Sequence, residues 1–332
     1  MLELTQAEIS FVVNTLRETA QLARRIQSGM ALMNLTKSDF SPVTVADFAL
    51  QAVTAHRLSE AFPGAALVAE ERAARLREPE NAKMLEVVTD FVGRVIPGAT
   101  TDQVCAWIDL GADAPGDAFW TLDPIDGTKG YRRGGQYAVA LAYVDQGQVT
   151  LGGLACPNLG EDGTPELMGL GALAVAQRGK GSWLGALDCP EDPFVPTRVS
   201  DCANPAAARL LRSVESAHTN AEAIESLAAA LGITEDNVTL MDSQAKYLTL
   251  AAGKAELLFR LLSPAQLDYR ECIWDQAAGS IILEEAGGRV TDLKGKPLNF
   301  ATGRKLTDNI GVIASNGHLH DVALQALARM TA

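Results

Sequence analysis

The order of the predicted elements constrains this chain most. Residues 5–97 carry amphipathic helix patterns that end at glycine or at Pro-Gly. Hairpin patterns follow over residues 119–184, and strands then alternate with helices over residues 210–286. This order is typical of an α+β region followed by an α/β region. The chain has 332 residues, more than one hydrophobic core usually holds, so we predict two domains, 1–154 and 155–332.

One apolar strand pattern runs directly into two aspartates. Trp120-Thr121-Leu122 precedes Asp123-Pro124-Ile125-Asp126-Gly127, and the proline fixes the backbone between the acids. Both carboxylates can converge on one point, with the Ile125 carbonyl as a third oxygen ligand. Such oxygens suit Mg²⁺, which completes its shell with water and substrate phosphate. Alone, the motif favours an Asp-Gly turn in which Asp126 bonds to its own backbone.

Three further acids lie where elements begin or end. Glu70 follows the apolar stretch 67–69, and Asp47 is predicted at the start of a helix. Asp275 is predicted to be the N-cap of a helix whose first turn is small residues, which leaves that helix end open to a phosphate. Taken singly, each position is more typical of a charged loop or an ordinary helix cap.

Charge and composition exclude several functional classes. The formal net charge is −13, from 41 acidic and 28 basic residues, which argues against a nucleic-acid or membrane surface. A small anionic substrate is still compatible, because divalent cations on clustered carboxylates reverse the local field. No apolar run approaches the roughly 20 residues that span a bilayer. The start of the chain lacks a basic region, so we expect no signal peptide and a cytoplasmic protein.

The cysteines indicate neither a disulfide framework nor a zinc site. They are odd in number and show no C-x-x-C spacing. We interpret them as small buried hydrophobic residues, with a redox-switch pair as the less favoured alternative. The five are Cys105, Cys156, Cys189, Cys202 and Cys272.

Together, the acidic motifs form an ordered set. VAEE, DPIDGTKG and WDQAAG resemble the inositol monophosphatase family of lithium-sensitive, metal-dependent phosphatases. More narrowly, SPVTVADFALQAV, MDSQAKY and YRECIWDQAAG resemble its 3'(2'),5'-bisphosphate nucleotidases, and the similarity runs from about residue 5 to residue 325. The resemblance implies a layered αβαβα sugar-phosphatase fold: an antiparallel N-terminal sheet with helices, and a smaller mixed-sheet α/β domain.

The resemblance also implies the catalytic residues. Asp47 and the Thr128 hydroxyl would orient and deprotonate the attacking water, as general base and relay. The backbone N–H groups of Gly127 and Thr128 would cradle the scissile phosphate. Two to three Mg²⁺ ions are implied, with these ligands: Glu70, Asp123, the Ile125 carbonyl, Asp126, Asp275 and, for a third ion, Asp47.

Substrate-binding residues are implied in the second half of the chain. Lys246 and Arg260 would bind a second phosphate that is not cleaved. The further positions are His218, Thr219 and Ser243. This chain departs from the family pattern at Gln276, where relatives commonly carry His, and in the slightly longer segment 261–269.

These residues lead to three functional hypotheses. The first is hydrolysis of adenosine 3',5'-bisphosphate to AMP and phosphate, with 3'-phosphoadenylyl sulfate as a second substrate, in sulfur metabolism. The second keeps the metals but makes the substrate an inositol polyphosphate, cleaved at the 1-phosphate. The third is a nucleotide sensor without catalysis, ranked last because the acids and Thr128 are all present. We expect a monomer or weak homodimer.

Overall fold

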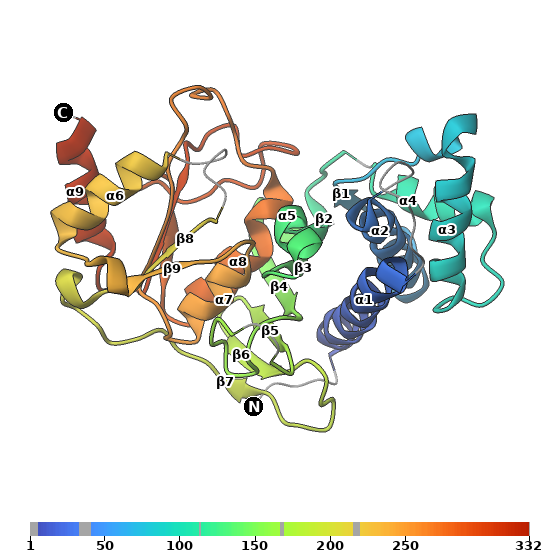
Figure 1. Cartoon of the computed structure of the whole chain (residues 1–332), viewed down its shortest axis with the longest axis horizontal. Helices are drawn as coiled ribbons and strands as arrows, with labels where there is room; N and C mark the ends of the chain where they lie inside the picture. Colours follow the sequence, from blue (N-terminus) through green and yellow to red (C-terminus); the bar gives the residue numbers. More distant parts are fainter. Residues whose placement is uncertain (1–5, 33–40, 113, 167–168, 215–219, 332) are drawn as a thin grey trace.

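The computed structural model describes residues 6–32, 41–112, 114–166, 169–214 and 220–331. In these ranges, helices alternate with two β-sheets in five layers (Figure 1). Three hydrophobic cores in this part of the chain fill the spaces between the layers. The predicted αβαβα fold is therefore confirmed.

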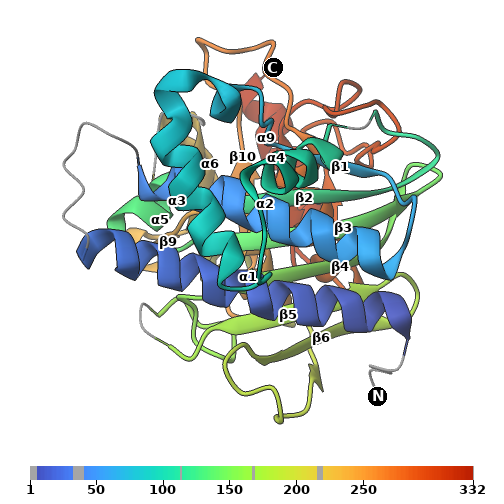
Figure 2. The ribbon, with the colours of Figure 1, turned by 90° about the vertical axis from the view of Figure 1, so that its right-hand side faces the viewer.

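Helices of the first layer cover the outer face of the first sheet. Helix α1 lies across the strands β3 to β5, and α2 lies on β2 (Figure 2). Their apolar faces, which include Leu16, Ile26 and Leu50, are fully buried in the first core. The bounds are α1 Ala7–Leu32, α2 Pro42–Ala61, α3 Ala82–Gly93 and α4 Thr101–Leu110.

The first sheet is antiparallel except at one edge, where β1 pairs in parallel with β2. Its strands follow one another in chain order, so each antiparallel neighbour needs only a short connection. Both predicted hairpins are confirmed, at β3–β4 and β5–β6. The strands are β1 Leu67–Ala69, β2 Ala118–Asp126, β3 Ala138–Asp145, β4 Gln148–Cys156, β5 Ala172–Gln177, β6 Gly181–Ala186 and β7 Val195–Pro196.

Two helices, α7 (Ala245–Ala251) and α8 (Ala277–Glu285), form the middle layer. Helix α8 lies so close to β4 that a Cβ on Gly152 would be 2.4 Å from Ile281 Cγ2. Ile281, Ile282 and Leu283 are fully buried, and each contributes about 1.5–3 kcal/mol of hydrophobic stabilisation. This packing fixes the start of α8 beside the first sheet.

The second sheet is mixed, with strand order β11-β12-β10-β8-β9. Its parallel strands β9, β8 and β10 end at the same edge, and helices α6 and α9 cover its outer face. The bounds are α6 Ala221–Leu231, α9 His320–Thr331, β8 Leu210–Arg212, β9 Val238–Leu240, β10 Leu257–Arg260, β11 Arg289–Thr291 and β12 Val312–Ser315.

The predicted domain boundary between residues 154 and 155 falls inside β4, and the same sheet continues to Pro196. The division into two domains stays a prediction. All five cysteines are free; Cys105 and Cys156 are buried, and the other three are partly exposed. Among the described helices, none combines the length and the apolar character needed to cross a membrane.

Candidate active site

A cavity of about 290 Å³ lies where the two sheets meet. It is bounded by the end of β2, the start of α5 (Thr128–Arg133), the loop before α7 and the carboxyl ends of β8 and β10. Ligands of α/β proteins commonly bind at such strand ends. The predicted site residues that line it are Glu70, Asp123, Ile125, Asp126, Gly127, Thr128, Ser243, Lys246, Arg260 and Asp275.

A β-bulge brings Asp123 and Asp126 onto one face of the sheet. Asp123 pairs with Ala140 and Asp126 with Ala138, so the strand carries one extra residue between them. In a regular strand, residues three apart would point to opposite faces. The sequence predicted that the proline between the acids lets the two carboxylates converge; β2 continues through Asp126, and the bulge around this proline brings them to one face.

Glu70 reaches the same place from β1. Ala69 is in register with Leu122 in the parallel pair, so Glu70 follows beside Asp123. The loop is held by Gln51, which accepts from the Glu71 N–H (2.9 Å), and by Arg304, which donates to the Ala69 carbonyl. Partial burial and the nearby carboxylates of Glu71 and Asp126 raise the pKa of Glu70 to about 7, although its side chain keeps an exposed edge.

Asp275 is not the N-cap of a helix, so that prediction is wrong. It ends a 3-10 turn, Ile273–Asp275, and Gln276 is the N-cap of α8. Its Oδ2 accepts from the Cys272 N–H (3.3 Å), which closes the turn. Burial, followed by the charges of Glu271 and Asp126, raises the pKa of Asp275 well above the usual range.

Asp47 lies in the second turn of α2, because the helix begins at Pro42 and not near Asp47 as predicted. Its side chain is buried and is not among the residues that line the cavity. Burial and the neighbouring charges of Glu71 and Glu70 raise its pKa. We call the acids that line the cavity, Glu70, Asp123, Asp126 and Asp275, the acidic wall. Asp47 therefore lies behind the acidic wall, on the side of the first helical layer.

The acidic wall fits a hard cation. Oδ1 of Asp47 and Oδ1 of Asp123 are buried without a hydrogen-bond partner among the described residues. Burial, with the charges of four neighbouring acids, raises the pKa of Asp123 well above its usual range. No three His, Cys, Asp or Glu side chains of the described chain already converge on one point as a metal centre. Nevertheless, an all-oxygen, acid-rich donor set with unsatisfied oxygens matches the chemistry of Mg²⁺.

Two cations also line the cavity. Lys246 is buried, and its Nζ donates to the carbonyls of Ser243 (2.8 Å) and Met241 (3.2 Å). Burial lowers the pKa of Lys246 to about 8, although the charge of Asp126 opposes this shift. Arg260 is paired with Glu271. The cavity is thus lined by both acidic and basic side chains.

Ser243 lies in the loop that joins Asp126 to α7, the helix that carries Lys246. It adopts a left-handed backbone conformation, with φ at 66°, which turns the chain from β9 into α7. The next N–H, of Gln244, donates to Asp126 Oδ2 at 2.5 Å. Gly127 is required opposite, because its φ is 85° and an added Cβ would lie 2.9 Å from the Cβ of Ser243.

His218 and Thr219 lie outside the described residues. Sequence reasoning missed several lining residues, among them Tyr247, Tyr269 and Gln276. Signals were present for all three: Tyr247 ends the MDSQAKY motif, Tyr269 lies in the longer segment 261–269, and Gln276 departs from the family pattern.

Five alternating layers, with an acid-walled cavity where two sheets meet, define the class of metal-dependent sugar phosphatases. Within this class, the chain belongs to the inositol monophosphatase family, whose model matches residues 4–332. Members of this family are magnesium-dependent phosphatases, and sensitivity to lithium is a family property.

Similar proteins agree with this assignment. The chain is 36% identical to a 3'(2'),5'-bisphosphate nucleotidase of Schizosaccharomyces pombe, over 98% of this chain and 96% of the relative. It is 37% identical to a 3'(2'),5'-bisphosphate nucleotidase of Oryza sativa, over 97% and 93%. The solved structure of Mycobacterium tuberculosis SuhB matches with a TM-score of 0.62 at 21% identity, over 96% of this chain and 95% of that one.

Proposed function

We propose that this protein hydrolyses the 3'-phosphate of adenosine 3',5'-bisphosphate to give AMP and phosphate. The observation that carries the proposal is a cavity lined by both acids and cations, because a substrate with two phosphates can place one at the acids with their bound metal and the other at Lys246 and Arg260. The acidic wall, with bound cations, suits the phosphate that is cleaved. Lys246 and Arg260 suit the phosphate that is retained, as a point charge and a planar donor fork. The names of the relatives support the same substrate.

Each acidic residue has a proposed role. Glu70, Asp123, Asp126 and Asp275, with the Ile125 carbonyl, would hold two Mg²⁺ ions, and Asp47 would help to hold a third. Bound magnesium supplies a Lewis acid that acidifies water and offsets the charge of the phosphate.

The remaining chemistry is positioning and proton transfer. Asp47 accepts the proton of the attacking water, and the Thr128 hydroxyl relays it; the packing of α2 on α5 brings their helices together. The N–H groups of Gly127 and Thr128 bind the phosphate oxygens. No covalent protein nucleophile is needed, since phosphoryl transfer depends mainly on positioning and charge stabilisation.

The wider setting is also part of the proposal. We expect 3'-phosphoadenylyl sulfate to be a second substrate, because it carries the same 3'-phosphate beside a charged 5' group. The protein would act in the cytoplasm, as a monomer or weak homodimer, and serve sulfur metabolism.

The test is phosphate release from adenosine 3',5'-bisphosphate and from inositol 1,4-bisphosphate, with Mg²⁺, with chelator and with added Li⁺. We expect fast cleavage of the nucleotide alone, dependent on Mg²⁺ and blocked by Li⁺. Preference for the inositol would keep the acidic wall but overturn the roles of Lys246 and Arg260. Nucleotide binding without phosphate release from either compound would favour a sensor.

A further inference from the structure

Arg260 is held by a series of hydrogen-bonded polar side chains that begins on helix α7. The Tyr247 hydroxyl of α7 donates to Gln276 Oε1 at 2.5 Å. Gln276 Nε2 donates to Glu271 Oε2 at 3.2 Å. Glu271 in turn accepts from Arg260 Nε (3.1 Å) and from Arg260 Nη2 (2.7 Å to Oε2 and 3.0 Å to Oε1).

The middle of this series is largely buried, although Tyr247 and Gln276 border the cavity. Tyr247, Gln276 and Glu271 are 3%, 2% and 4% exposed. In such an environment hydrogen bonds strengthen one another, and a lost partner is costly because water cannot replace it. The amide of Gln276 therefore fixes the Glu271 carboxylate, which fixes the guanidinium plane.

This arrangement divides the donors of Arg260. Nε and Nη2 form one edge of the guanidinium, and both are bonded to Glu271. Nη1 has no hydrogen-bond partner in the part of the chain that the structure describes, and Arg260 lines the cavity. A guanidinium held along one edge has its remaining donors pre-aligned, so a ligand need not pay to order them.

We propose that Gln276, through Glu271, is a positioning residue that aims Arg260 at the substrate phosphate that is not cleaved. Gln276 then sets the preference for bisphosphates over monophosphates through Arg260. This inference rests on the proposed function, because it assigns Arg260 to the second phosphate.

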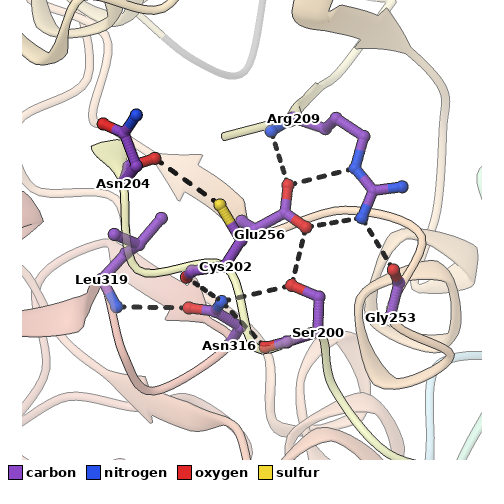
Figure 3. Close-up of polar contacts among 8 residues, drawn as sticks. All are labelled: Ser200, Cys202, Asn204, Arg209, Gly253, Glu256, Asn316 and Leu319. Atoms are coloured by element: carbon purple, nitrogen blue, oxygen red, sulfur yellow. Dashed lines mark hydrogen bonds and ion pairs between the residues drawn. The ribbon is translucent and has the colours of Figure 1, made fainter. Parts of the chain in front are cut away.

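The central variant is Gln276→Leu, which keeps the size of the side chain and removes both hydrogen bonds. Gln276→His should retain function, because imidazole can accept from Tyr247 with one nitrogen and donate to Glu271 with the other. Tyr247→Phe removes only the hydrogen bond from the Tyr247 hydroxyl to Gln276. It replaces Gln276→Leu as the test variant if Gln276→Leu does not fold. The matched control is Asn316→Leu, because Asn316 is another buried amide (1% exposed). Asn316 bonds to Ser200, Cys202 and Leu319 beside the start of β10, at the end of the strand away from Arg260 (Figure 3).

The measurement is kcat/KM for adenosine 3',5'-bisphosphate divided by kcat/KM for adenosine 3'-monophosphate. We expect this ratio to fall about tenfold in Gln276→Leu, through KM, and less in Tyr247→Phe. The ratio should be unchanged in Gln276→His and in Asn316→Leu. In an Arg260→Ala background, Gln276→Leu should lower the ratio no further, because its effect acts through Arg260.

An equal loss for both substrates would contradict the inference, since it would mean that Gln276 acts on the neighbouring Asp275 and not on Arg260. An undiminished effect of Gln276→Leu in the Arg260→Ala background would also overturn it. If the wild-type protein does not cleave the bisphosphate at all, the proposed function itself fails, which is a separate and recognisable result.

Discussion

Two arginine–glutamate pairs, each with a buried glutamate, stand at opposite ends of β10. Glu256 directly precedes the strand and pairs with Arg209, whereas Arg260 ends the strand and pairs with Glu271. The glutamates are equally inaccessible, at 1% and 5% side-chain exposure. The two pairs are chemically the same, and they differ in what else surrounds the guanidinium.

The pair at the start of β10, Arg209 with Glu256, does not line the cavity, and we call it the closed pair. Figure 3 shows Glu256 accepting from the Ser200 hydroxyl (2.7 Å), the Arg209 backbone N–H (2.6 Å) and the Arg209 guanidinium. Arg209 Nη2 also donates to the Gly253 carbonyl (2.7 Å). Ser200 belongs to the connection that leaves the first sheet, so this pair ties the two sheets together.

The pair at the end of β10 is open toward the cavity, because Arg260 lines it and bonds to Glu271 through one edge only. Both arginines bond through Nε and Nη2, and among the described residues neither Nη1 has a hydrogen-bond partner. The comparison teaches that the surroundings of the remaining donors decide the use of such a pair: those of Arg209 are exposed to solvent, whereas those of Arg260 lie beside a cavity and are suited to binding.

The largest effect should come from the acidic wall. Asp123→Asn should lower kcat/KM for every substrate by about 10³-fold or more, because it weakens cation binding that supplies several kcal/mol of charge stabilisation. Without Mg²⁺, the variant should melt no lower than the wild type, since one repelling acid is removed. Near-wild-type turnover would disprove the assignment of Asp123.

The next largest effect should come from the open pair, Arg260 with Glu271. Arg260→Ala should raise KM for adenosine 3',5'-bisphosphate about 10- to 100-fold, because a hydrogen bond to a charged group contributes about that factor to binding. KM for adenosine 3'-monophosphate should stay nearly unchanged. Steady-state kinetics with both substrates measures this. Equal losses for the two substrates would remove the distinction between the pairs.

The closed pair should act on stability instead. Glu256→Gln should lower the free energy of unfolding by about 3 kcal/mol, because the new amide N–H₂ faces the donors of Arg209. Urea titration measures the loss, and kcat under native conditions should stay unchanged. A change in substrate preference would show that the two pairs are not independent.

The smallest effect is a pH dependence of the closed pair. Burial acts to raise the pKa of Glu256, but hydrogen bonds from Arg209 outweigh it, and the net pKa lies below the ordinary 4.5. A lowered pKa gives stability that is present above pH 4.5 and is lost as the pH falls through the folded-state value. The difference in unfolding free energy between wild type and Glu256→Gln should thus shrink below about pH 4.5; a constant difference would exclude the ionised pair as its source.

Local patterns predicted much of the fold. Helix α6 runs from Ala221 to Leu231 as its apolar period indicates, and both hairpins form around their glycine turns. Helix α4 was missed although Thr100 and Gln103 form a capping box at its start. Strands β11 and β12 were also missed, because three or four residues carry little period of their own and pair only once the second sheet exists.

The candidate site, too, was predictable from the sequence only in part. Motifs and family resemblance named the residues around the cavity, since each acid follows a recognisable strand or turn. The bulge between Asp123 and Asp126 depends on pairing with β3, and the bonds of Gln276 depend on the approach of α7 to α8. Neither leaves a local signal, because both arise from contacts between segments far apart in the chain.

The bulge in β2 makes the active site sensitive to residue number as much as to residue type. Deleting Pro124 or Ile125 would restore a regular ladder in which Asp123 and Asp126 are two residues apart and still share a face, but it would remove or displace the Ile125 carbonyl between them, with every acid still present in the chain. Substitutions at these two positions keep the count and can be absorbed by repacking. This strand should therefore tolerate exchange far better than insertion or deletion, and its length is itself part of the catalytic design.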